Sequence, residues 1–310
     1  MFESMGIYYL GPVDGHDMDK LIKILNVAKR IKGPVLVHVV TQKGRGYKPA
    51  ERNPSKFHGI GPFDVATGME INKSDRPTYS QVFSNSICEI AKKDRSVCAI
   101  TAAMPDGVGL AKFSKWFPDR FFDVGIAEEH AVVFSSGLAK NGMIPFFAVY
   151  STFLQRSYDQ LIHDVAMQDL KVVFCIDRAG FVGEDGESHQ GIFDTAYLMS
   201  VPNLTIYSPT YFEELSSMMY LATYKEKHAV AIRYPRGGEG EKPDGYSYNK
   251  EEFSVFGDIN AKNCIVTYGR EFCNCYQAFC ELDDTFLIKI NKIKPLNEKI
   301  VDVAKNAKHI

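Results

Sequence analysis

Two apolar runs that flank an amphipathic helix constrain the fold of this chain more than any other feature. Residues 121–126 (FFDVGI) predict a buried strand, and residues 127–140 carry apolar side chains at helical spacing. Gly142 stands where a glycine commonly ends a helix. A second strand is predicted at residues 143–150 and a second helix at residues 152–167. This strand–helix–strand–helix order is the repeating unit of a doubly wound parallel α/β sheet.

Polar residues follow both predicted strands, at the edge where parallel sheets bind their ligands. Glu128 follows the first strand, and Tyr150, Phe153 and Arg156 follow the second. Because residues 121–126 are strongly apolar, we predict that their strand is not an edge strand and that Glu128 emerges into a crevice. The alternative is that Glu128 only offsets the dipole of the helix it begins. A carboxylate, aromatic rings and a cation at one rim favour a binding site.

Composition excludes several classes of partner. The 310 residues are 45% hydrophobic and 24% charged, with a formal net charge of −2, as in an ordinary globular protein of about two domains. This charge gives no reason to expect a nucleic acid or an anionic membrane as partner. No apolar run approaches the ~18 residues of a membrane span. The first residues also lack a signal peptide pattern, so we expect a cytoplasmic protein.

Cysteine use agrees with that location. The chain has seven cysteines, an odd number, which favours reduced thiols over a disulfide framework. Cys273, Cys275 and Cys280 lie close in sequence, but they form no CxxC pair and have no histidine nearby. We therefore predict no metal site among them.

Residues 1–68 predict a small α/β segment. A strand begins at Tyr8, Asp17 is placed to cap a helix at residues 18–31, and residues 34–41 predict a second strand. A basic, polar loop follows at residues 42–59. Two strands and one helix are too few to close a core, so we interpret this segment as the end of a larger domain.

Three further segments follow it. Residues 69–77 form a polar connector, residues 78–242 carry the parallel sheet, and residues 245–310 begin another α/β segment with two predicted strands. We expect two parallel strands with their helices to be too few for a stable core.

A long glycine-rich loop at residues 177–191 interrupts the sheet domain. Loops of this length inside a compact domain are usually functional. The loop supplies Arg178, Asp185 and His189, and the last strand of the domain leads to Arg236. Arginines at strand ends can bind a phosphate bidentately, although surface ion pairs are the alternative.

Three stretches carry a specific family resemblance. IAEEHA at residues 126–131, YSTFLQRSYDQ at 150–160 and DRAGFVGEDGESHQG at 177–191 resemble the 1-deoxy-D-xylulose-5-phosphate synthase family. The resemblance extends over residues 2–307. It implies a thiamine-diphosphate-dependent, transketolase-like homodimer that decarboxylates pyruvate and joins the remaining two-carbon unit to glyceraldehyde 3-phosphate. The product serves isoprenoid precursor and thiamine synthesis.

The resemblance also implies roles for individual residues at the cofactor. Glu128 would hydrogen-bond N1′ of the aminopyrimidine and promote deprotonation of the cofactor. Phe153 would stack on the pyrimidine ring. Lys43 and His58 would approach the diphosphate, with His58 also acting in catalysis, and Tyr47 would lie at the cofactor.

The substrate side follows from the same resemblance. Arg178 and Arg236 would hold the phosphate of glyceraldehyde 3-phosphate. His189 would donate a proton or orient the substrate by a hydrogen bond. The remaining substrate-side residues would be Tyr150, Arg156 and Asp185. Of the substrate-side residues, His189, Asp185 and Tyr150 would lie near the reacting carbons, with His189 and Asp185 acting in catalysis.

The chain departs from the family pattern at the diphosphate. The family binds Mg²⁺ through a GDG motif and a later asparagine, and no GDG occurs here. We therefore expect the magnesium ligands to lie outside this chain, and the isolated chain to have little or no activity. A fragment, a mis-started reading frame and a split enzyme with a separate diphosphate-domain chain remain open. So do a transketolase-like or 2-oxoacid dehydrogenase β-type subunit and a non-catalytic dimerising fragment.

Overall fold

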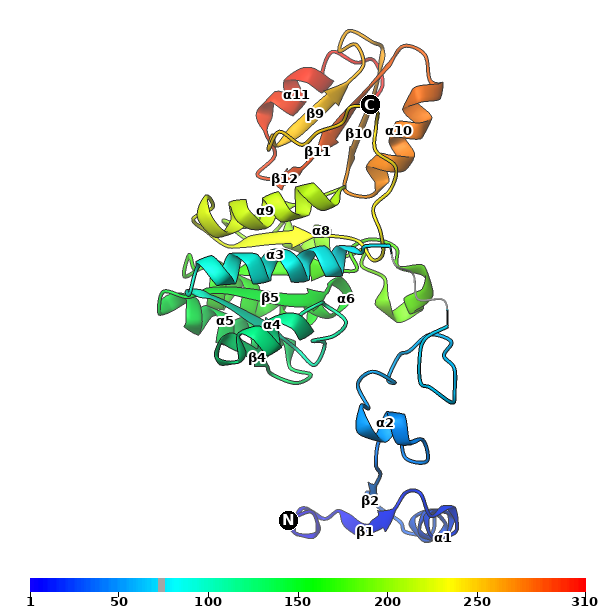
Figure 1. Ribbon diagram of the computed structural model, residues 1–310. Helices are drawn as coiled ribbons and strands as arrows, with labels where there is room; N and C mark the ends of the chain where they lie inside the picture. Colours follow the sequence, from blue (N-terminus) through cyan, green and yellow to red (C-terminus); the bar gives the residue numbers. More distant parts are fainter. Residues whose placement is uncertain (72–75) are drawn as a thin grey trace. The chain divides into compact units, whose positions relative to one another are not determined.

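The computed structural model describes residues 1–71 and 76–310. The chain divides into two compact units, Met1–Asp75 and Arg76–Ile310, and each is described by itself (Figure 1). The connector predicted at residues 69–77 includes residues 72–75, which lie outside the described residues. Within the described ranges, no helix combines the length and apolar content that crossing a membrane requires.

The smaller unit contains one parallel β–α–β motif. Asp17 caps its helix as predicted, because the Asp17 carboxylate accepts a hydrogen bond from the backbone N–H of Lys20. No residue of this helix is buried, and Met18, Ile22 and Leu25 leave its apolar side exposed. A short helix, α2, also interrupts the predicted loop. The elements are η1 (Glu3–Met5), β1 (Tyr8–Asp14), α1 (Met18–Ala28), β2 (Val35–Val40) and α2 (Lys48–Arg52).

The larger unit is built on a seven-stranded sheet with the order β12-β7-β8-β6-β5-β3-β4. All neighbouring strands are parallel except β12, which is antiparallel to β7. This confirms the predicted parallel α/β sheet. Its strands are β3 (Val97–Thr101), β4 (Phe121–Asp123), β5 (Ile144–Tyr150), β6 (Val173–Asp177), β7 (Thr205–Tyr207), β8 (Val230–Arg233) and β12 (Lys292–Lys294).

Helices cover both faces of this sheet, which makes it doubly wound (Figure 1). Side chains of β5 alternate between the two faces. Phe146 and Ala148 pack with α3 and α9, whereas Phe147 and Val149 pack with α5. Gly142, two residues after the end of α5, has a φ of +84°, as a helix-ending glycine requires. The helices are α3 (Tyr79–Lys93), α4 (Ala111–Trp116), η2 (Pro118–Arg120), α5 (Glu128–Lys140), α8 (Asp194–Leu198) and α9 (Phe212–Tyr224).

The prediction that the strand before Glu128 is not an edge strand is wrong. Strand β4 lies at the end of the sheet and pairs only with β3. Its residues Phe121 and Phe122 are only partly buried, and the Phe122 ring packs against Phe134 of α5 with centroids 5.0 Å apart. The apolar character of this strand therefore reflects the helix that covers it and not a second neighbouring strand.

The single helix predicted at residues 152–167 is divided into shorter pieces. They are α6 (Ser151–Leu154), η3 (Gln155–Ser157), α7 (Tyr158–Gln160) and the π-helical turn η4 (Leu161–Ala166). The Ser157 hydroxyl donates to the Leu154 carbonyl at 3.1 Å. A serine hydroxyl in this position competes with the helical backbone hydrogen bonds, which accounts for the first break.

The C-terminal segment of the larger unit forms a second, three-stranded sheet. The sequence predicted two of its strands and missed β9, which runs antiparallel to β11 and completes the sheet. It also missed β12, which joins the central sheet. Phe286, Ile288 and Ile300 are buried in a separate core here. The elements are β9 (Phe253–Phe256), β10 (Asn263–Tyr268), α10 (Glu271–Glu281), β11 (Thr285–Ile290) and α11 (Glu298–Ala304).

A buried ion pair connects this second sheet to the central domain. The Lys289 ammonium on β11 lies 2.9 Å from the Glu214 carboxylate on α9, and neither side chain is exposed. The Tyr246 hydroxyl donates to the same carboxylate.

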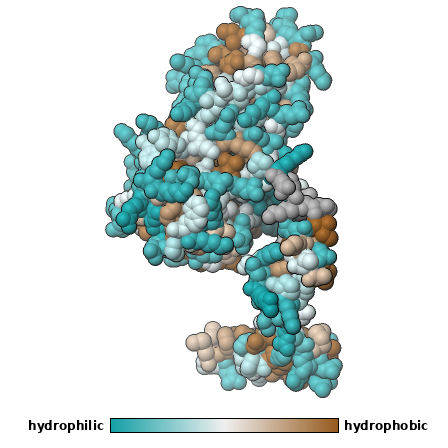
Figure 2. Space-filling model, in the orientation of Figure 1, coloured by the Kyte–Doolittle hydropathy of each residue, from teal (hydrophilic) through white to brown (hydrophobic). Residues whose placement is uncertain are grey.

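The face of the molecule seen in Figure 2 is mostly hydrophilic, with hydrophobic residues in small patches.

Candidate functional site

The first turn of α5 meets the helix that follows β5. Glu128 begins α5, and its side chain is 2% exposed. Nη1 of Arg156 donates to Oε1 of Glu128 at 2.7 Å. The Arg156 guanidinium also lies over the Phe153 ring, with its carbon 5.1 Å from the ring centroid. The predicted carboxylate, cation and aromatic ring are therefore in direct contact.

Three rings lie next to this ion pair. Tyr150, the last residue of β5, stacks on Phe153 with centroids 5.9 Å apart. The ring of His189, which ends the short helix η6 (Glu187–His189), meets Phe153 edge-on at 5.4 Å and Tyr150 at 6.4 Å. Burial raises the pKa of Tyr150, so its hydroxyl keeps its proton at neutral pH and can donate a hydrogen bond.

Two arginines meet at one carboxylate next to Tyr150. The Arg178 guanidinium carbon lies 4.0 Å from the Tyr150 ring centroid. Asp185, in the short helix η5 (Gly183–Asp185), places Oδ2 3.5 Å from Nε of Arg178 and 3.2 Å from Nε of Arg236. In the described part of the chain, Arg178 Nε and Asp185 Oδ2 are buried and make no hydrogen bond. The Arg178–Asp185 contact is thus electrostatic, and the Arg178 donor can still bind a ligand.

These contacts form one continuous series, which we call the contact chain. It runs from the buried carboxylate of Glu128 through the rings to the arginine pair at Asp185. The structure therefore brings together every site residue predicted in the larger unit. They are Glu128, Tyr150, Phe153, Arg156, Arg178, Asp185, His189 and Arg236.

The other three predicted site residues belong to the smaller unit. Tyr47 precedes α2, and its hydroxyl donates to the Val65 carbonyl at 2.8 Å. Its ring packs against the rings of Phe57 and Phe63. The side chains of Lys43 and His58 are exposed. Tyr47 thus supports the local structure of this unit, whereas the side chains of Lys43 and His58 face solvent.

Three residues that surround Arg178 were not predicted. Asp177, Ser80 and Gly107 all contact the Arg178 guanidinium or the groups that hold it. Asp177 ends a strand of otherwise apolar residues, FCID, and a carboxylate at that position was a usable signal. Ser80 and Gly107 lie far from Arg178 in sequence, and no spacing pattern indicates them.

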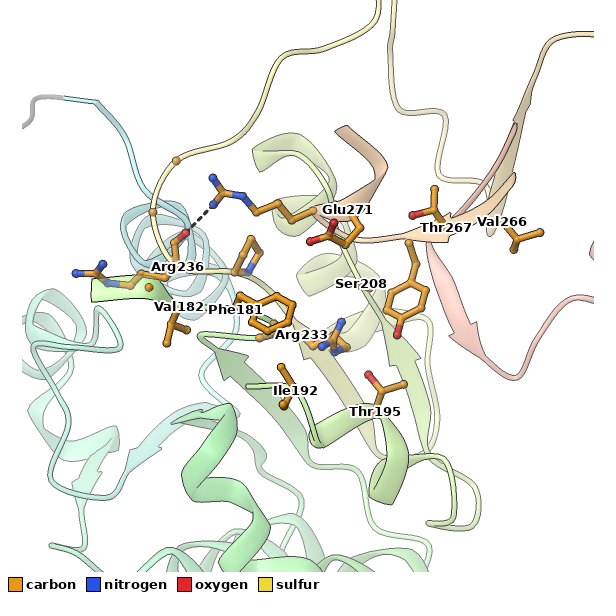
Figure 3. Close-up of a pocket in the computed structure, with 18 residues that line it drawn as sticks. Phe181, Val182, Ile192, Thr195, Ser208, Arg233, Arg236, Val266, Thr267 and Glu271 are labelled. Carbon is orange, nitrogen blue, oxygen red and sulfur yellow. Dashed lines mark hydrogen bonds between the residues drawn. The ribbon is translucent and has the colours of Figure 1, made fainter. Parts of the chain in front are cut away.

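A cavity of about 890 Å³ lies beside the contact chain, between the central domain and the second sheet (Figure 3). Arg236 contributes to its wall, as do Phe181 and Ile192. The backbone carbonyl of Arg236 accepts a hydrogen bond from Nη1 of Arg270 at 2.9 Å, shown as the dashed line in Figure 3. The second sheet therefore helps to hold the segment that carries Arg236.

A family model described as "Transketolase, pyrimidine binding domain" matches residues 75–238, which include the whole contact chain. The chain belongs to the transketolase pyrimidine-binding domain family. A model described as "1-deoxy-D-xylulose-5-phosphate synthase" matches residues 1–41.

Relatives of this pyrimidine-binding family member confirm the resemblance seen in its motifs. The 1-deoxy-D-xylulose-5-phosphate synthase of Caldanaerobacter subterraneus subsp. tengcongensis is 47% identical over 308 residues, covering 97% of this chain and 49% of the relative. That of Natranaerobius thermophilus is 57% identical over 242 residues, covering 77% of this chain and 38% of the relative. The chain thus spans about half the length of these relatives, or less.

Solved structures share the fold of this pyrimidine-binding family member. Transketolase from Campylobacter jejuni superposes with a TM-score of 0.66 at 15% identity, covering 99% of this chain and 60% of that chain. A "Split gene transketolase, inactive beta4 tetramer" superposes with a TM-score of 0.64 at 23% identity, covering 74% and 77%. The synthase relatives and the pyrimidine-binding family model together indicate a family of thiamine-diphosphate-dependent transferases.

Proposed function

We propose that this chain forms the pyrimidine-binding and phosphate-binding part of a 1-deoxy-D-xylulose-5-phosphate synthase. The complete enzyme would decarboxylate pyruvate and transfer the remaining two-carbon unit to glyceraldehyde 3-phosphate, for isoprenoid precursor and thiamine synthesis. The contact chain carries this proposal, because it joins a buried carboxylate to a pair of arginines across one row of aromatic rings. A nitrogen heterocycle and a phosphate at opposite ends match that arrangement.

The Glu128 end suits the aminopyrimidine of thiamine diphosphate. A buried carboxylate beside an aromatic ring offers one hydrogen-bond acceptor and one flat apolar surface, as such a ring needs. Because Arg156 occupies Oε1 of Glu128, we assign Oε2 to the proton at N1′ and the Phe153 ring to stacking. When bound, the cofactor supplies the electron sink for decarboxylation. Glu128 then has the task of holding a proton at the pyrimidine nitrogen.

The Arg178 end suits the phosphate of glyceraldehyde 3-phosphate. The buried Arg178 Nε donor has no hydrogen bond among the described residues, and a phosphate oxygen would satisfy it. Arg236 approaches the same point from the end of β8. Between the two ends we assign Tyr150 and His189 to hydrogen bonds with the reacting carbonyl groups, since their rings lie at the centre of the contact chain.

The diphosphate side requires groups beyond those described here. By resemblance we assign Lys43, Tyr47 and His58 to it. Among the described residues, no three or more His, Cys, Asp or Glu side chains lie together as metal ligands. By the resemblance, which places the Mg²⁺ ligands in a GDG motif that does not occur in this sequence, those ligands would belong to further polypeptide of the diphosphate-binding domain. The exposed apolar side of α1 supports such a contact.

The remaining assignments rest mainly on the family. We assign residues 1–68 to the end of the diphosphate-binding domain, 69–77 to a linker, 78–242 to the pyrimidine-binding domain and 245–310 to the start of the C-terminal domain. A homodimer follows from the resemblance. A cytoplasmic location is supported by the seven cysteines, none of which forms a disulfide.

Complementation of the missing portion tests the proposed reaction. This chain would be mixed with a polypeptide comprising the part of the Caldanaerobacter synthase that it leaves uncovered. Formation of 1-deoxy-D-xylulose 5-phosphate from pyruvate and glyceraldehyde 3-phosphate would then be measured. We expect product from the mixture, little or none from the chain alone, and a loss of ~100-fold or more with E128Q.

Glu129 provides a matched control on the same helical turn. It is exposed, whereas Glu128 is buried, so E129Q changes the charge equally and should leave the rate unchanged. Calorimetric titration of glyceraldehyde 3-phosphate into the chain alone tests the phosphate end separately. No product from any mixture, together with no binding of this substrate, would contradict the proposal.

A further inference from the structure

A set of hydrogen-bonding groups holds the Arg178 guanidinium, and Asp177 lies at its centre. Asp177 is the last residue of β6, and its side chain is not exposed to solvent. Its Oδ2 accepts hydrogen bonds from Nη1 of Arg178 at 2.8 Å and from the Ser80 hydroxyl at 2.7 Å. Its Oδ1 accepts from the backbone N–H of Arg178 at 2.7 Å. One carboxylate thus binds both the backbone and the side chain of the next residue.

The backbone of Arg178 adopts the conformation that this arrangement requires. Its φ is +60°, in the left-handed region that a long side chain rarely occupies. In this turn the Arg178 side chain folds back onto the carboxylate of the residue before it. The three hydrogen bonds that Asp177 accepts, two from Arg178 and one from Ser80, offset the cost of the unusual conformation.

The contacts of the guanidinium divide its donors into two groups. Nη1 donates to Asp177 and also to the Gly107 carbonyl at 2.8 Å, and the Tyr150 ring lies 4.0 Å from the guanidinium carbon. These contacts fix the plane of the group. Nε instead faces Asp185 and makes no hydrogen bond among the described residues. The scaffold therefore uses one end of the guanidinium and leaves the edge that carries Nε for a ligand.

Burial makes Asp177 unsuited to contact a substrate directly. The same burial raises the pKa of its carboxyl group, against the opposing effects of Arg178 and Ser80. The Arg178 guanidinium and the Ser80 hydroxyl are thus the groups that favour its charged form. This mutual dependence ties the charge of Asp177 to the orientation of Arg178.

We propose that Asp177, supported by Ser80, is a positioning residue that fixes the Arg178 guanidinium and thereby sets the affinity and selectivity for the phosphate of the substrate. The inference rests on the proposed function for the phosphate, but its geometric part concerns Arg178 alone. Asp177 does not touch the ligand. Its removal should weaken the binding of phosphorylated ligands specifically.

Calorimetry of the full chain tests the affinity. Glyceraldehyde 3-phosphate and unphosphorylated glyceraldehyde would be titrated into the wild type and into D177N, which keeps the side-chain volume. We expect D177N to bind the phosphorylated ligand about tenfold or more weakly, as for loss of a charge-assisted hydrogen bond. Binding of glyceraldehyde should not change, and S80A should give a smaller loss of the same kind.

Asp194 and Arg233 provide the matched control. They form another buried carboxylate–arginine pair at the same sheet, with hydrogen bonds of 3.0 Å to Nε and Nη2. D194N should lower stability in the way that D177N does, but it should leave the affinity for glyceraldehyde 3-phosphate unchanged. Equal affinity in D177N and wild type, or an equal loss in D194N, would overturn the proposal.

Nuclear magnetic resonance of the arginine side chains tests the geometry without any ligand. The Nη1–H signal of Arg178, assigned by its absence in R178K, should exchange slowly in the wild type, where Nη1 donates to Asp177 and Gly107, and rapidly in D177N. If the wild type does not bind glyceraldehyde 3-phosphate, the proposed function fails, and this signal alone decides the positioning role. A slow Arg178 signal retained in D177N would overturn it.

Discussion

Arg156 donates a hydrogen bond across 2.7 Å to Glu128, and the two partners differ sharply in exposure. The Glu128 side chain is 2% exposed, whereas that of Arg156 is 48% exposed. The arginine therefore connects a buried carboxylate to the solvent-facing side of the site. One oxygen of Glu128 is already occupied before any ligand binds, and this limits how a ligand can approach it.

Removal of the arginine should destabilise the fold through the carboxylate left behind. We expect R156M to lower the free energy of unfolding by ~1–3 kcal/mol, less than for a fully buried pair because Arg156 is half exposed. The double variant E128Q/R156M should recover part of that loss, since the buried charge is then absent. Urea denaturation followed by circular dichroism gives both values.

The ion pair of Lys305 with Asp302 provides the comparison, because both of its side chains are exposed. K305M should change the stability little. If R156M is no more destabilising than K305M, the buried carboxylate does not depend on Arg156.

Gly107 leaves the space that the Tyr150 hydroxyl occupies. A Cβ atom built on Gly107 would lie 2.0 Å from that oxygen. G107A should therefore displace Tyr150 and lower the free energy of unfolding by ~1–3 kcal/mol. Y150F should restore part of the stability of G107A, since it removes the oxygen that clashes. Thermal denaturation of the two single variants and the double variant measures this coupling.

Gly137 is the matched control for this substitution. It lies within α5, and a Cβ atom there would meet nothing within 4 Å. G137A should raise the stability by ~0.5–1 kcal/mol, because alanine is the better helix former. A stable G107A variant with an unchanged Tyr150 environment would contradict the steric argument.

The sequence could predict the part of the site that follows directly from strand order. Tyr150 ends β5, Arg178 follows β6 and Glu128 begins the helix after β4, and a parallel sheet brings such residues to one edge. Arg236 follows from the same rule. These side chains could therefore be named before their contacts were known, and the family resemblance agreed with them.

The features that the sequence did not predict depend on contacts between distant segments. Strand β12 has only three residues, KIK, and it becomes a strand because β7 lies beside it. The edge position of β4 was missed because a covering helix and a neighbouring strand demand the same apolar residues. Ser80 and Gly107 are distant from Arg178 in sequence and meet it only in the folded sheet. No local spacing pattern could therefore predict these contacts.

Buried thiols should resist alkylation in the folded chain. Burial raises the pKa of Cys98 to about 12 and raises that of Cys175 well above its ordinary value. Because the thiolate is the reactive form, iodoacetamide at pH 8 should leave both unmodified, whereas the exposed Cys280 should react. Mass spectrometry of peptides gives the extent of reaction at each site.

Unfolding in urea provides the control for this experiment, since all seven cysteines should then react. At pH 9 the Cys98 thiol should still resist alkylation, because that pH remains below the raised pKa of Cys98. Modification of Cys98 at the rate of Cys280 in the folded chain would mean that the core around β3 opens readily.

Asp185 occupies the position between Arg178 and Arg236 that a phosphate would take. Its Oδ2 lies 3.5 Å from one Nε and 3.2 Å from the other, and it is buried without a hydrogen bond among the described residues. The carboxylate thus competes with an anion for the same two cations. D185N should raise the affinity for inorganic phosphate by about two- to fivefold, the effect of losing a partly exposed ion pair.

Glu187 provides the matched control for Asp185, because its replacement separates the effect of position from the effect of charge. It is exposed and lies two residues further along the same loop, so E187Q removes an equal charge at a short distance from the arginines. Calorimetry with inorganic phosphate should show tighter binding for D185N and little change for E187Q. An equal gain in both variants would indicate general charge repulsion. A loss of affinity in D185N would mean that Asp185 helps to hold the ligand, because its carboxylate orders the two arginines more than it competes for them.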